Sequence, residues 1–302
     1  MPTPPPVATD APPAAAADAA VQPGALYVVA TPIGNLGDLS PRAAAVLGAV
    51  DRICAEDTRT TGTLLAHLGL RRPMTALHEH NEDRIATGLV ALLREGRSLA
   101  LVSDAGTPLV SDPGFALVRA ARAAGQPVFA VPGPCAAVAA LSISGLPSDS
   151  FVFAGFLPPK AAARRERLRR LGAEPRTVIV YESSHRIGEC LDDVVEALGP
   201  QRRVCLAREL TKRFEESRAG TAAELRDWQA QDPNRGRGEF VLLIEGETRD
   251  GGLAEGERVL RLLLPELPLS AAARLAAEIT GAPRRKLYDA ALRIGGSEPG
   301  QD

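Results

Sequence analysis

Short apolar runs alternate with helix-forming segments along this chain, and no other feature limits its fold as strongly. The run LYVVATP leads through a glycine-containing turn to Ser40 and Pro41, a favourable N-cap and first helical residue. The runs DRICAE, SLALVSD and PVFAVP repeat this pattern, and Asp112 with Pro113 is expected to start the helix before the last of them. This alternation predicts an α/β domain with a doubly wound, mostly parallel sheet over residues 24–147.

A second series of strands follows an interruption between Gly145 and Ser150, where a glycine, a proline and two serines stand close together. The runs FVFAGFLP, RTVIVYE, RVCLARE and GEFVLLIEG predict another α/β domain over residues 148–248, with some antiparallel strands. Residues 249–302 are expected to form a linker and a hairpin of two short helices joined at Gly281 to Pro283, helix-turn-helix in shape. Residues 1–23, rich in proline and alanine, predict a disordered extension.

Composition narrows the classes of function that the chain can have. Its 302 residues are 45% hydrophobic, which is enough apolar material for two cores. The 35 basic and 37 acidic side chains give a net charge of −2, so any RNA contact is local rather than a uniformly positive coat. Four dispersed cysteines and four histidines predict a reducing cytoplasm and neither disulfides nor a metal site. No run approaches the roughly 20 apolar residues that span a membrane.

Three loops that follow predicted strands carry residues typical of a ligand site, and ligands of open α/β sheets bind at the carboxyl ends of the strands. TPIGNLGD lacks the G-x-G-x-x-G spacing, and no Walker A sequence occurs, which argues against NAD and P-loop chemistry. SDAGTPLVSDPG holds Asp104, a hydrogen-bond acceptor, and Gly106, which lets the backbone approach a ligand. VPGPCAA places Gly133 before a helix N-terminus with free N–H groups. Each loop alone is ordinary turn chemistry, but together they predict a small-molecule site.

Eight segments, in order along the chain, resemble the ribosomal small-subunit methyltransferase I family of the tetrapyrrole methylase superfamily. They are ATPIGNLGDLS, AEDTRTTGTLL, LVSDAGTPLVSDPG, VPGPCA, FVFAGFLPPK, YESSHR, ARELTK and GEFVLLIEG, and the C-terminal LSAAARLAAEITGAPRRKLYDAAL is similar to the family's terminal helical module. The resemblance implies the class III methyltransferase fold, with a cleft between two α/β domains, S-adenosylmethionine as cofactor and a homodimer. It also implies 2′-O-methylation of a cytidine ribose near the decoding centre of 16S rRNA, within the 30S subunit.

The resemblance further implies a set of cofactor-binding residues, each at a strand end or a helix start. They are Pro32, Gly34, Asp104, Ala105, Gly106, Thr107, Pro108, Ser111, Cys135, Ala136, Phe156 and Leu157. One position departs from the family pattern, because Ser184 precedes His185 where the family has a proline. This change frees a backbone N–H group and softens the turn.

Transfer of a methyl group to a ribose hydroxyl needs alignment of the reacting atoms and the removal of one proton. Charged residues at predicted strand ends are the candidates for this catalytic role, and they are Asp57, Arg59, Glu182, His185 and Lys212. Structural interpretations stay open beside the catalytic ones. Asp57 can simply cap the next helix, His185 can be a surface side chain, and Lys212 can form an ordinary ion pair with Glu209.

Two basic segments predict contacts with RNA phosphates. The segment from Lys160 to Arg170 has six basic residues and one acidic residue, directly after a loop expected to line the cleft. The predicted phosphate contacts are Lys160, Arg164, Arg165, Arg167, Arg284, Arg285 and Lys286. Either segment can instead be a solvated helix face. Since aromatic residues make up only 4% of the chain, we expect recognition of the folded rRNA shape rather than a base-stacking platform.

Two other functions fit part of the sequence. A methyltransferase that acts on a precorrin or another tetrapyrrole would use the same cofactor loops, but a small anionic macrocycle requires neither basic segment. A non-catalytic RNA-binding protein with this fold would have no need of intact cofactor loops. Binding of S-adenosylmethionine distinguishes this last alternative from both enzymes.

Overall fold

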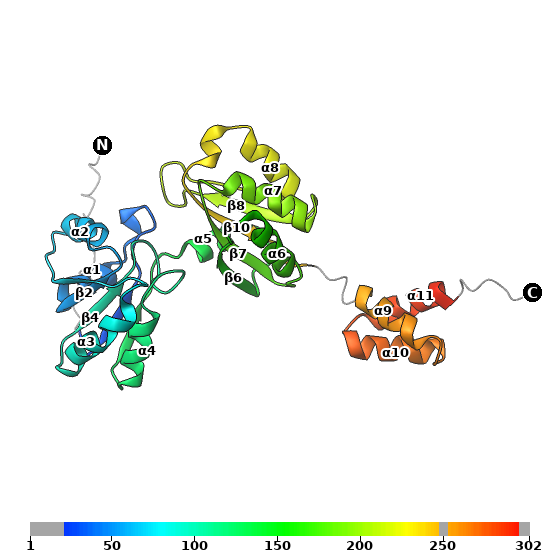
Figure 1. Ribbon diagram of the computed structural model, residues 1–302, viewed down its shortest axis with the longest axis horizontal. Helices are drawn as coiled ribbons and strands as arrows, with labels where there is room; N and C mark the ends of the chain where they lie inside the picture. The colour runs from blue at the N-terminus through cyan, green and yellow to red at the C-terminus, as the bar shows by residue number, and fades with distance from the viewer. Residues whose placement is uncertain (1–20, 248–252, 296–302) are drawn as a thin grey trace, which may run out of the picture.

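The protein folds into two α/β domains and a helical module (Figure 1). A computed structural model describes residues 21–247 and 253–295, so the predicted N-terminal extension lies, up to residue 20, outside the described residues. All four cysteines are free thiols. Within the described ranges, no helix is long and apolar enough to cross a membrane, and no cluster of His, Cys, Asp and Glu side chains is suited to a metal ion.

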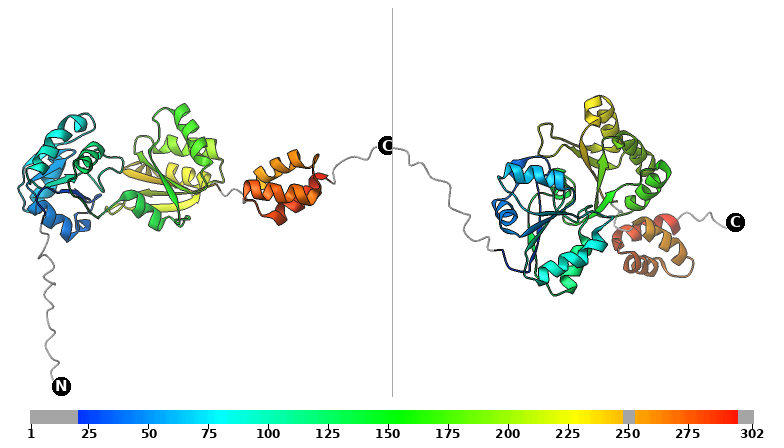
Figure 2. Two further views of the ribbon diagram at one scale, coloured as in Figure 1. Left: turned by 90° about the horizontal axis from the view of Figure 1, so that it is seen from below. Right: turned by 60° about the vertical axis from the view of Figure 1, so that its left-hand side comes forward.

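The first domain is a parallel sheet with helices on both faces, as the alternating pattern predicts. Its strand order is β3-β2-β4-β1-β5, and every neighbouring pair is parallel. Helices α1 and α2 pack on one face, and α3 and α4 pack on the other (Figure 2). The elements are β1 (Leu26–Val29), α1 (Pro41–Ala49), β2 (Arg52–Ala55), α2 (Thr58–His67), β3 (Met74–Ala76), α3 (Glu82–Arg94), β4 (Leu99–Val102), α4 (Phe115–Ala123) and β5 (Val128–Val131). A short 3-10 helix, Leu36–Asp38, lies in the loop after β1.

The second domain is a mixed sheet in the order β6-β7-β10-β8-β9. Only β6 and β7 pair in parallel, and the other three pairs are antiparallel, in line with the expected antiparallel strands. Helices α6, α7 and α8 cover one face through a common apolar core. The elements are β6 (Phe151–Phe156), α6 (Ala161–Gly172), β7 (Thr177–Ser183), α7 (Ile187–Leu198), β8 (Arg203–Arg208), β9 (Glu216–Thr221), α8 (Ala222–Ala230) and β10 (Glu239–Ile244). A 3-10 helix, Pro233–Gly236, precedes β10.

Helix α5 (Ala136–Ile143) covers the other face of the second sheet, although the sequence assigns it to the first domain. Its buried residues Ala137, Ala140 and Leu141 belong to the same apolar cluster as Ile179 of β7 and Val241 of β10. Helix α5 therefore joins the two domains: it enters from the loop after β5 and packs against the second sheet. This position brings the N-terminus of α5 to the region between the sheets.

The C-terminal module contains three helices, whereas the sequence predicts two. Helices α10 (Leu269–Thr280) and α11 (Arg284–Gly295) form the expected pair, and the chain turns at Gly281, whose φ of 71° suits glycine. Helix α9 (Leu253–Leu263) was interpreted as part of a linker because of its glycine, but its Val259 and Leu260 are buried in the module's core. The module thus has an apolar core of its own, built from all three helices.

Candidate active site

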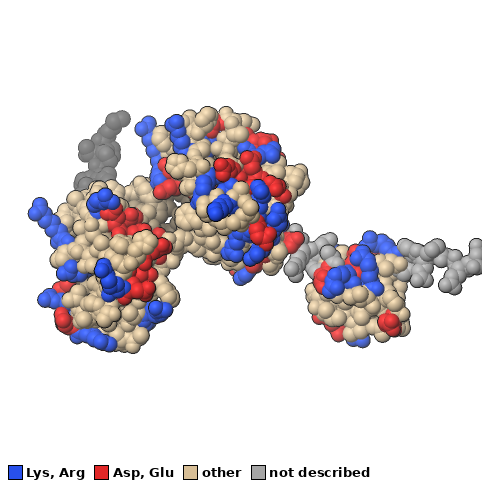
Figure 3. Space-filling model, in the orientation of Figure 1, with Lys and Arg blue, Asp and Glu red and all other residues tan. Residues whose placement is uncertain are grey.

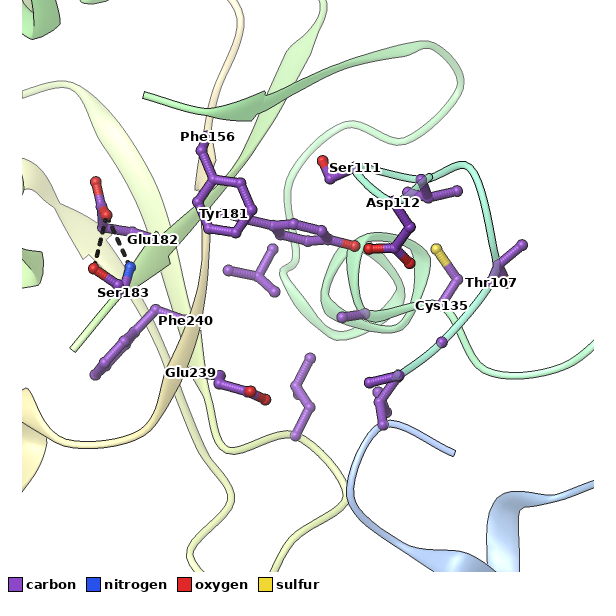
Figure 4. A pocket seen from close by; sticks show the side chains of 17 residues that line it. Thr107, Ser111, Asp112, Cys135, Phe156, Tyr181, Glu182, Ser183, Glu239 and Phe240 are labelled. Atoms are coloured by element: carbon purple, nitrogen blue, oxygen red, sulfur yellow. Dashed lines mark hydrogen bonds between the residues drawn. The ribbon is translucent and has the colours of Figure 1, made fainter. Parts of the chain in front are cut away.

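A cavity of about 350 Å³ lies between the two domains, with walls from both (Figure 4). The first domain contributes the loops after β1 and β4, and the second contributes β6, β7, β10 and the segment after β8. The start of α5 completes the wall. The lining residues are Ile33, Ala105, Gly106, Thr107, Val110, Ser111, Asp112, Cys135, Ala136, Phe156, Tyr181, Glu182, Ser183, Leu210, Glu239, Phe240 and Val241.

The loop after β4 owes its shape to unusual backbone conformations. Gly106 has a φ of 85°, and a Cβ atom there would lie 3.2 Å from Cγ2 of Ile33, so glycine is required for the close approach of this loop to the loop after β1. The backbone groups of Gly106 and Thr31 exchange two hydrogen bonds of 3.1 and 2.8 Å. Thr107 Oγ1 donates to the carbonyl of Pro134 over 2.9 Å. These bonds tie together the loops that follow β1, β4 and β5.

Asp112 lies in the cavity wall. The sequence predicts that Asp112 starts a helix, but the structure shows that it does not. Helix α4 begins at Phe115, because Gly114 at its N-cap has a φ of 122°. Burial raises the pKa of Asp112 to about 6; a hydrogen bond with Ser103 opposes this shift, and the nearby acidic side chains Glu56 and Asp104 add to it. Its carboxyl group lies near the Tyr181 hydroxyl and the Cys135 thiol, as Figure 4 shows.

Tyr181 fixes the start of α5 against β7. Its hydroxyl accepts a hydrogen bond of 3.2 Å from the backbone N–H of Ala137, one of the first N–H groups of the helix. Burial, together with the Cys135 thiol, raises the pKa of Tyr181 well above its usual value. Tyr181 is therefore a neutral side chain at the junction of the two domains.

A second cavity of about 440 Å³ shares Ile33, Ala105 and Glu239 with the first, so the two cavities are adjacent. It is more polar in character because four threonines and a serine line it. The complete lining is Thr31, Pro32, Ile33, Gly34, Leu36, Thr60, Thr61, Thr63, Leu64, Ser103, Asp104, Ala105, Lys212 and Glu239.

Lys212 crosses from the second domain to the first at this second cavity. Its Nζ donates to Glu209 Oε1 and Glu239 Oε2, each over 2.9 Å. Burial lowers the pKa of Lys212, but the hydrogen bonds to the two carboxylates outweigh burial, and the net pKa is raised. A Cβ atom on Gly34 would lie 2.5 Å from Cγ of Lys212, so only glycine leaves room for this side chain. Lys212 is thus held as a cation over the loop after β1.

Sequence comparisons match this architecture. A family described as Tetrapyrrole (Corrin/Porphyrin) Methylases matches residues 25–226, and one described as the RsmI C-terminal HTH domain matches residues 250–295. A ribosomal RNA small subunit methyltransferase I of Xylella fastidiosa (strain Temecula1) is 59% identical over 268 residues, which cover 88% of this chain and 98% of that protein. The protein of the same name from Escherichia coli O157:H7 is 54% identical over 271 residues, which cover 89% of this chain and 95% of that protein. The chain belongs to the ribosomal RNA small subunit methyltransferase I family.

Solved structures confirm the fold predicted for this family. The methyltransferase CobJ matches with a TM-score of 0.54 at 21% identity, and the match covers 74% of this chain and 94% of the CobJ chain. A uroporphyrin-III-C-methyltransferase from Thermus thermophilus has a TM-score of 0.50 at 25% identity, with the same coverage. The two α/β domains of this methyltransferase I family member thus have the tetrapyrrole methylase, or class III methyltransferase, fold.

Most of the predicted cofactor residues of this methyltransferase I family member line one of the two cavities. Ala105, Gly106, Thr107, Ser111, Cys135, Ala136 and Phe156 line the first, and Pro32, Gly34, Asp104 and again Ala105 line the second. Pro108 is not among the lining residues of either. Leu157 is 2% exposed and belongs to the core beneath α6 and α7, so its side chain is not available to a ligand.

The predicted catalytic residues do not all come together. Lys212 lines the second cavity, and Glu182 lines the first, where it pairs with Arg186 over 2.7 Å. Asp57 caps α2, which confirms the N-cap interpretation, and hydrogen bonds from Arg59 lower its pKa to about 2. Arg59 and His185 are exposed, and neither is among the lining residues of either cavity.

The prediction that Arg164 contacts RNA is wrong, because its side chain is only 1% exposed. Its guanidinium forms ion pairs with Asp193 and Glu189 of α7 and so joins α6 to α7. Arg165 is partly exposed and also pairs with Asp193.

The other residues predicted to contact RNA, Lys160, Arg167, Arg284, Arg285 and Lys286, are exposed. Basic side chains gather on the second domain and on the C-terminal module in Figure 3.

Several lining residues were not predicted from the sequence. Asp112 belongs to the predicted ligand loop SDAGTPLVSDPG but was assigned to a helix start, and Tyr181 and Glu239 were assigned to strands. Glu239 is the first residue of β10, which runs antiparallel to β7 and β8, so its start lies beside their carboxyl ends. The antiparallel order of these strands is the signal that would have identified Glu239, since it places the start of β10 at the ligand-binding edge.

Proposed function

We propose that this chain transfers a methyl group from S-adenosylmethionine to the 2′-hydroxyl of a cytidine ribose in 16S rRNA, near the decoding centre of the 30S subunit. The observation that carries the proposal is the pair of adjacent cavities between the two domains, in a chain whose relatives are named ribosomal RNA small subunit methyltransferase I. One cavity is suited to the cofactor, and the other is suited to the acceptor ribose.

The residues of the first cavity fit S-adenosylmethionine. Its volume of about 350 Å³ falls within the range of roughly 300–1,000 Å³ typical of ligand pockets. Apolar side chains such as Val110 and Phe240 suit an adenine ring, and the Asp112 carboxyl suits the cationic groups of the cofactor. Gly106 allows close contact with the backbone, and Ala136 lies at a helix N-terminus. When bound, the cofactor would supply a methyl carbon on a sulfonium sulfur, open to displacement by an oxygen nucleophile with S-adenosylhomocysteine as the thioether leaving group.

The second cavity supports a role in holding the ribose and its proton. The hydroxyls of Thr60, Thr61 and Ser103 can donate to and accept from ribose oxygens. Lys212 remains a cation and lowers the energy of negative charge on the attacking oxygen, while Glu239, which lines both cavities, accepts the proton. Asp57 is a weak candidate base because its low pKa makes the carboxylate a poor proton acceptor.

Local basic surfaces hold the RNA in this proposal. The exposed Lys160 and Arg167 on the α6 side and Arg284, Arg285 and Lys286 at the start of α11 contact phosphates. Arg164 is excluded by its burial. The cytoplasm, where ribosomal subunits are assembled, is the expected location.

A homodimer is the proposed assembly. Val138 and Ile143 of α5 and Phe151 at the start of β6 are 53%, 48% and 41% exposed in the single chain. A second copy that covers these apolar side chains removes them from water, which favours association.

Methyl-transfer assays on two kinds of substrate test the proposal. The protein is incubated with methyl-labelled S-adenosylmethionine and with 30S subunits from a strain that lacks its own methyltransferase I, with naked 16S rRNA, or with a uroporphyrinogen-type tetrapyrrole. We expect label in the 16S rRNA of the subunits. Label in the tetrapyrrole alone contradicts the proposal, and binding of the cofactor without transfer to any substrate identifies a non-catalytic protein.

A further inference from the structure

The loop between β8 and β9 has a fixed conformation. Glu209 and Thr211 adopt left-handed backbone conformations, with φ of 50° and 66°. The N–H of Thr211 donates to Glu215 Oε2 over 2.7 Å, and the N–H of Glu215 donates to the carbonyl of Lys212 over 3.1 Å. Together with the ion pairs of Lys212, these bonds define the position of the residues that follow it, Arg213 and Phe214.

Phe214 exposes its aromatic ring to solvent at this rigid loop. The residue is 64% exposed, and the guanidinium carbon of Arg213 lies 5.5 Å from the ring centroid. A single exposed apolar side chain is common on protein surfaces, so the ring points to a partner only together with its neighbours. An aromatic ring next to an arginine is the combination with which proteins stack and retain single-stranded nucleic acid.

Phe214 is close in the chain to a residue of the proposed acceptor site. Lys212 lines the second cavity, and Phe214 is two residues farther along the chain, at most about 7 Å away between Cα atoms. A ribose in the second cavity therefore brings the neighbouring nucleotides of the same strand to the region of Phe214. Its position beside the cavity, with a basic residue next to it, favours an RNA base over an apolar protein surface.

We propose that Phe214, flanked by Arg213, stacks on an unpaired base of the substrate RNA next to the nucleotide that is methylated. The inference rests on the proposed function and adds a base contact to it. The low aromatic content of the chain had argued against a stacking platform, but a single exposed ring at the entrance of the site is sufficient to hold one base.

Steady-state methylation of 30S subunits tests the stacking contact. In Phe214→Ala we expect the KM for subunits to rise about tenfold, within the range for loss of one base–aromatic stack, and Phe214→Trp to retain a KM near that of the wild type. The affinity for S-adenosylmethionine stays unchanged in both. Phe115→Ala is the matched control, because Phe115 is 61% exposed and carries Arg119 at 5.3 Å from its ring, yet it stands at the start of α4, in a different domain from Lys212. We expect the KM of this control to equal that of the wild type.

Tryptophan fluorescence gives a readout that does not depend on methyl transfer. The Phe214→Trp variant is titrated with a short single-stranded oligocytidylate, and stacking on the base is expected to quench the new fluorescence relative to wild type, whose Trp228 is buried. An unchanged KM in Phe214→Ala, or an unquenched Phe214→Trp, overturns the inference and leaves the proposed function in place. Failure of the wild type to methylate any rRNA overturns the proposed function. In that case the fluorescence titration of Phe214→Trp still tests whether residue 214 stacks on a base. A change of oligomeric state in Phe214→Ala with an unchanged KM identifies the ring as a contact between protein chains. This result also overturns the stacking inference.

Discussion

Asp112 is a carboxyl group whose charge changes close to neutral pH. Burial raises its pKa to about 6, and it faces the first cavity from the loop before α4. Between pH 3.8 and about 6 the folded protein keeps a proton on this group that the unfolded chain loses. The free energy of unfolding of the ligand-free protein therefore falls as the pH rises through this interval, and a cationic ligand that pairs with the ionised carboxylate offsets that loss.

Replacing Asp112 by Asn removes this dependence. We expect the free energy of unfolding of Asp112→Asn, relative to wild type, to increase as the pH rises from 3.8 to about 6 and then to stay constant, because only the wild type ionises. Urea denaturation of the ligand-free protein at several pH values measures the difference. The exposed Asp149 provides a control variant, Asp149→Asn. A stability difference for Asp112→Asn that is the same at every pH would show that this carboxyl titrates normally.

At the scale of single elements, α6 both packs against the core of the second domain and carries exposed basic side chains. Its sequence does not show which arginines have which role. Arg164 and Leu168 are buried against the second domain, whereas Lys160, at its N-cap, and Arg167 are exposed. An arginine-rich helix predicts a phosphate-binding surface, but Arg164 of this helix faces the core and requires an acidic partner there. Asp193 of α7 supplies that partner, and its distance in the sequence explains why Arg164 was assigned to the surface.

Removal of the buried guanidinium should destabilise the fold. Arg164→Ala leaves the buried Asp193 with the partly exposed Arg165 as its remaining ion-pair partner, and we expect the free energy of unfolding to fall by about 3 kcal/mol. The exposed Arg167→Ala should change it by no more than about 0.5 kcal/mol. Denaturant titrations of both variants measure these effects. Equal stability of the two variants would mean that the ion pair between α6 and α7 contributes nothing.

The elements that the sequence failed to predict have common physical reasons. Strand β9 (ESRAGT) lies at the sheet edge, is mostly exposed and so lacks an apolar run. Strand β3 has only three residues. Helix α8 begins with a capping box of Thr221 and Glu224, which is a recognisable signal of a helix start. The helix was not predicted because this signal lies within a long polar segment. Strands β1, β2 and β4 of the first sheet, by contrast, are largely buried apolar runs and were predicted directly.

At the scale of the whole molecule, the active site is assembled from parts that sequence reasoning treats separately. Loops after parallel strands were identified because carboxyl strand ends mark ligand sites. Tyr181, Glu239 and Phe240 come from the mixed second sheet, where the pairing of strands distant in sequence decides which ends meet the first domain. That pairing does not follow from the pattern of any single segment, so these three residues were not located in advance, whereas Phe156, Glu182 and Lys212 of the same domain were.

The C-terminal module should contribute RNA affinity and not cofactor binding. Its core is formed by its own three helices, so a chain ending at Glu247 should fold and bind S-adenosylmethionine normally. The affinity of this truncated chain for 16S rRNA should fall. If the three basic residues at the start of α11 contact phosphates, the slope of log affinity against log salt should decrease by about two units. The full-length Arg284→Gln, Arg285→Gln, Lys286→Gln triple variant should show the same loss of slope. An unchanged slope in the truncated chain would place the RNA path on the two sheet domains alone.

The chemistry of the modified nucleotide tests the central claim most directly. Subunits from a strain without methyltransferase I are treated with the purified protein and labelled S-adenosylmethionine, and the 16S rRNA is digested to nucleosides for mass spectrometry. We predict a single labelled product, 2′-O-methylcytidine, that maps to the decoding region and is absent when Lys212→Met replaces the wild type. A label on a base, or 16S rRNA without label from a protein that binds the cofactor, would contradict the account.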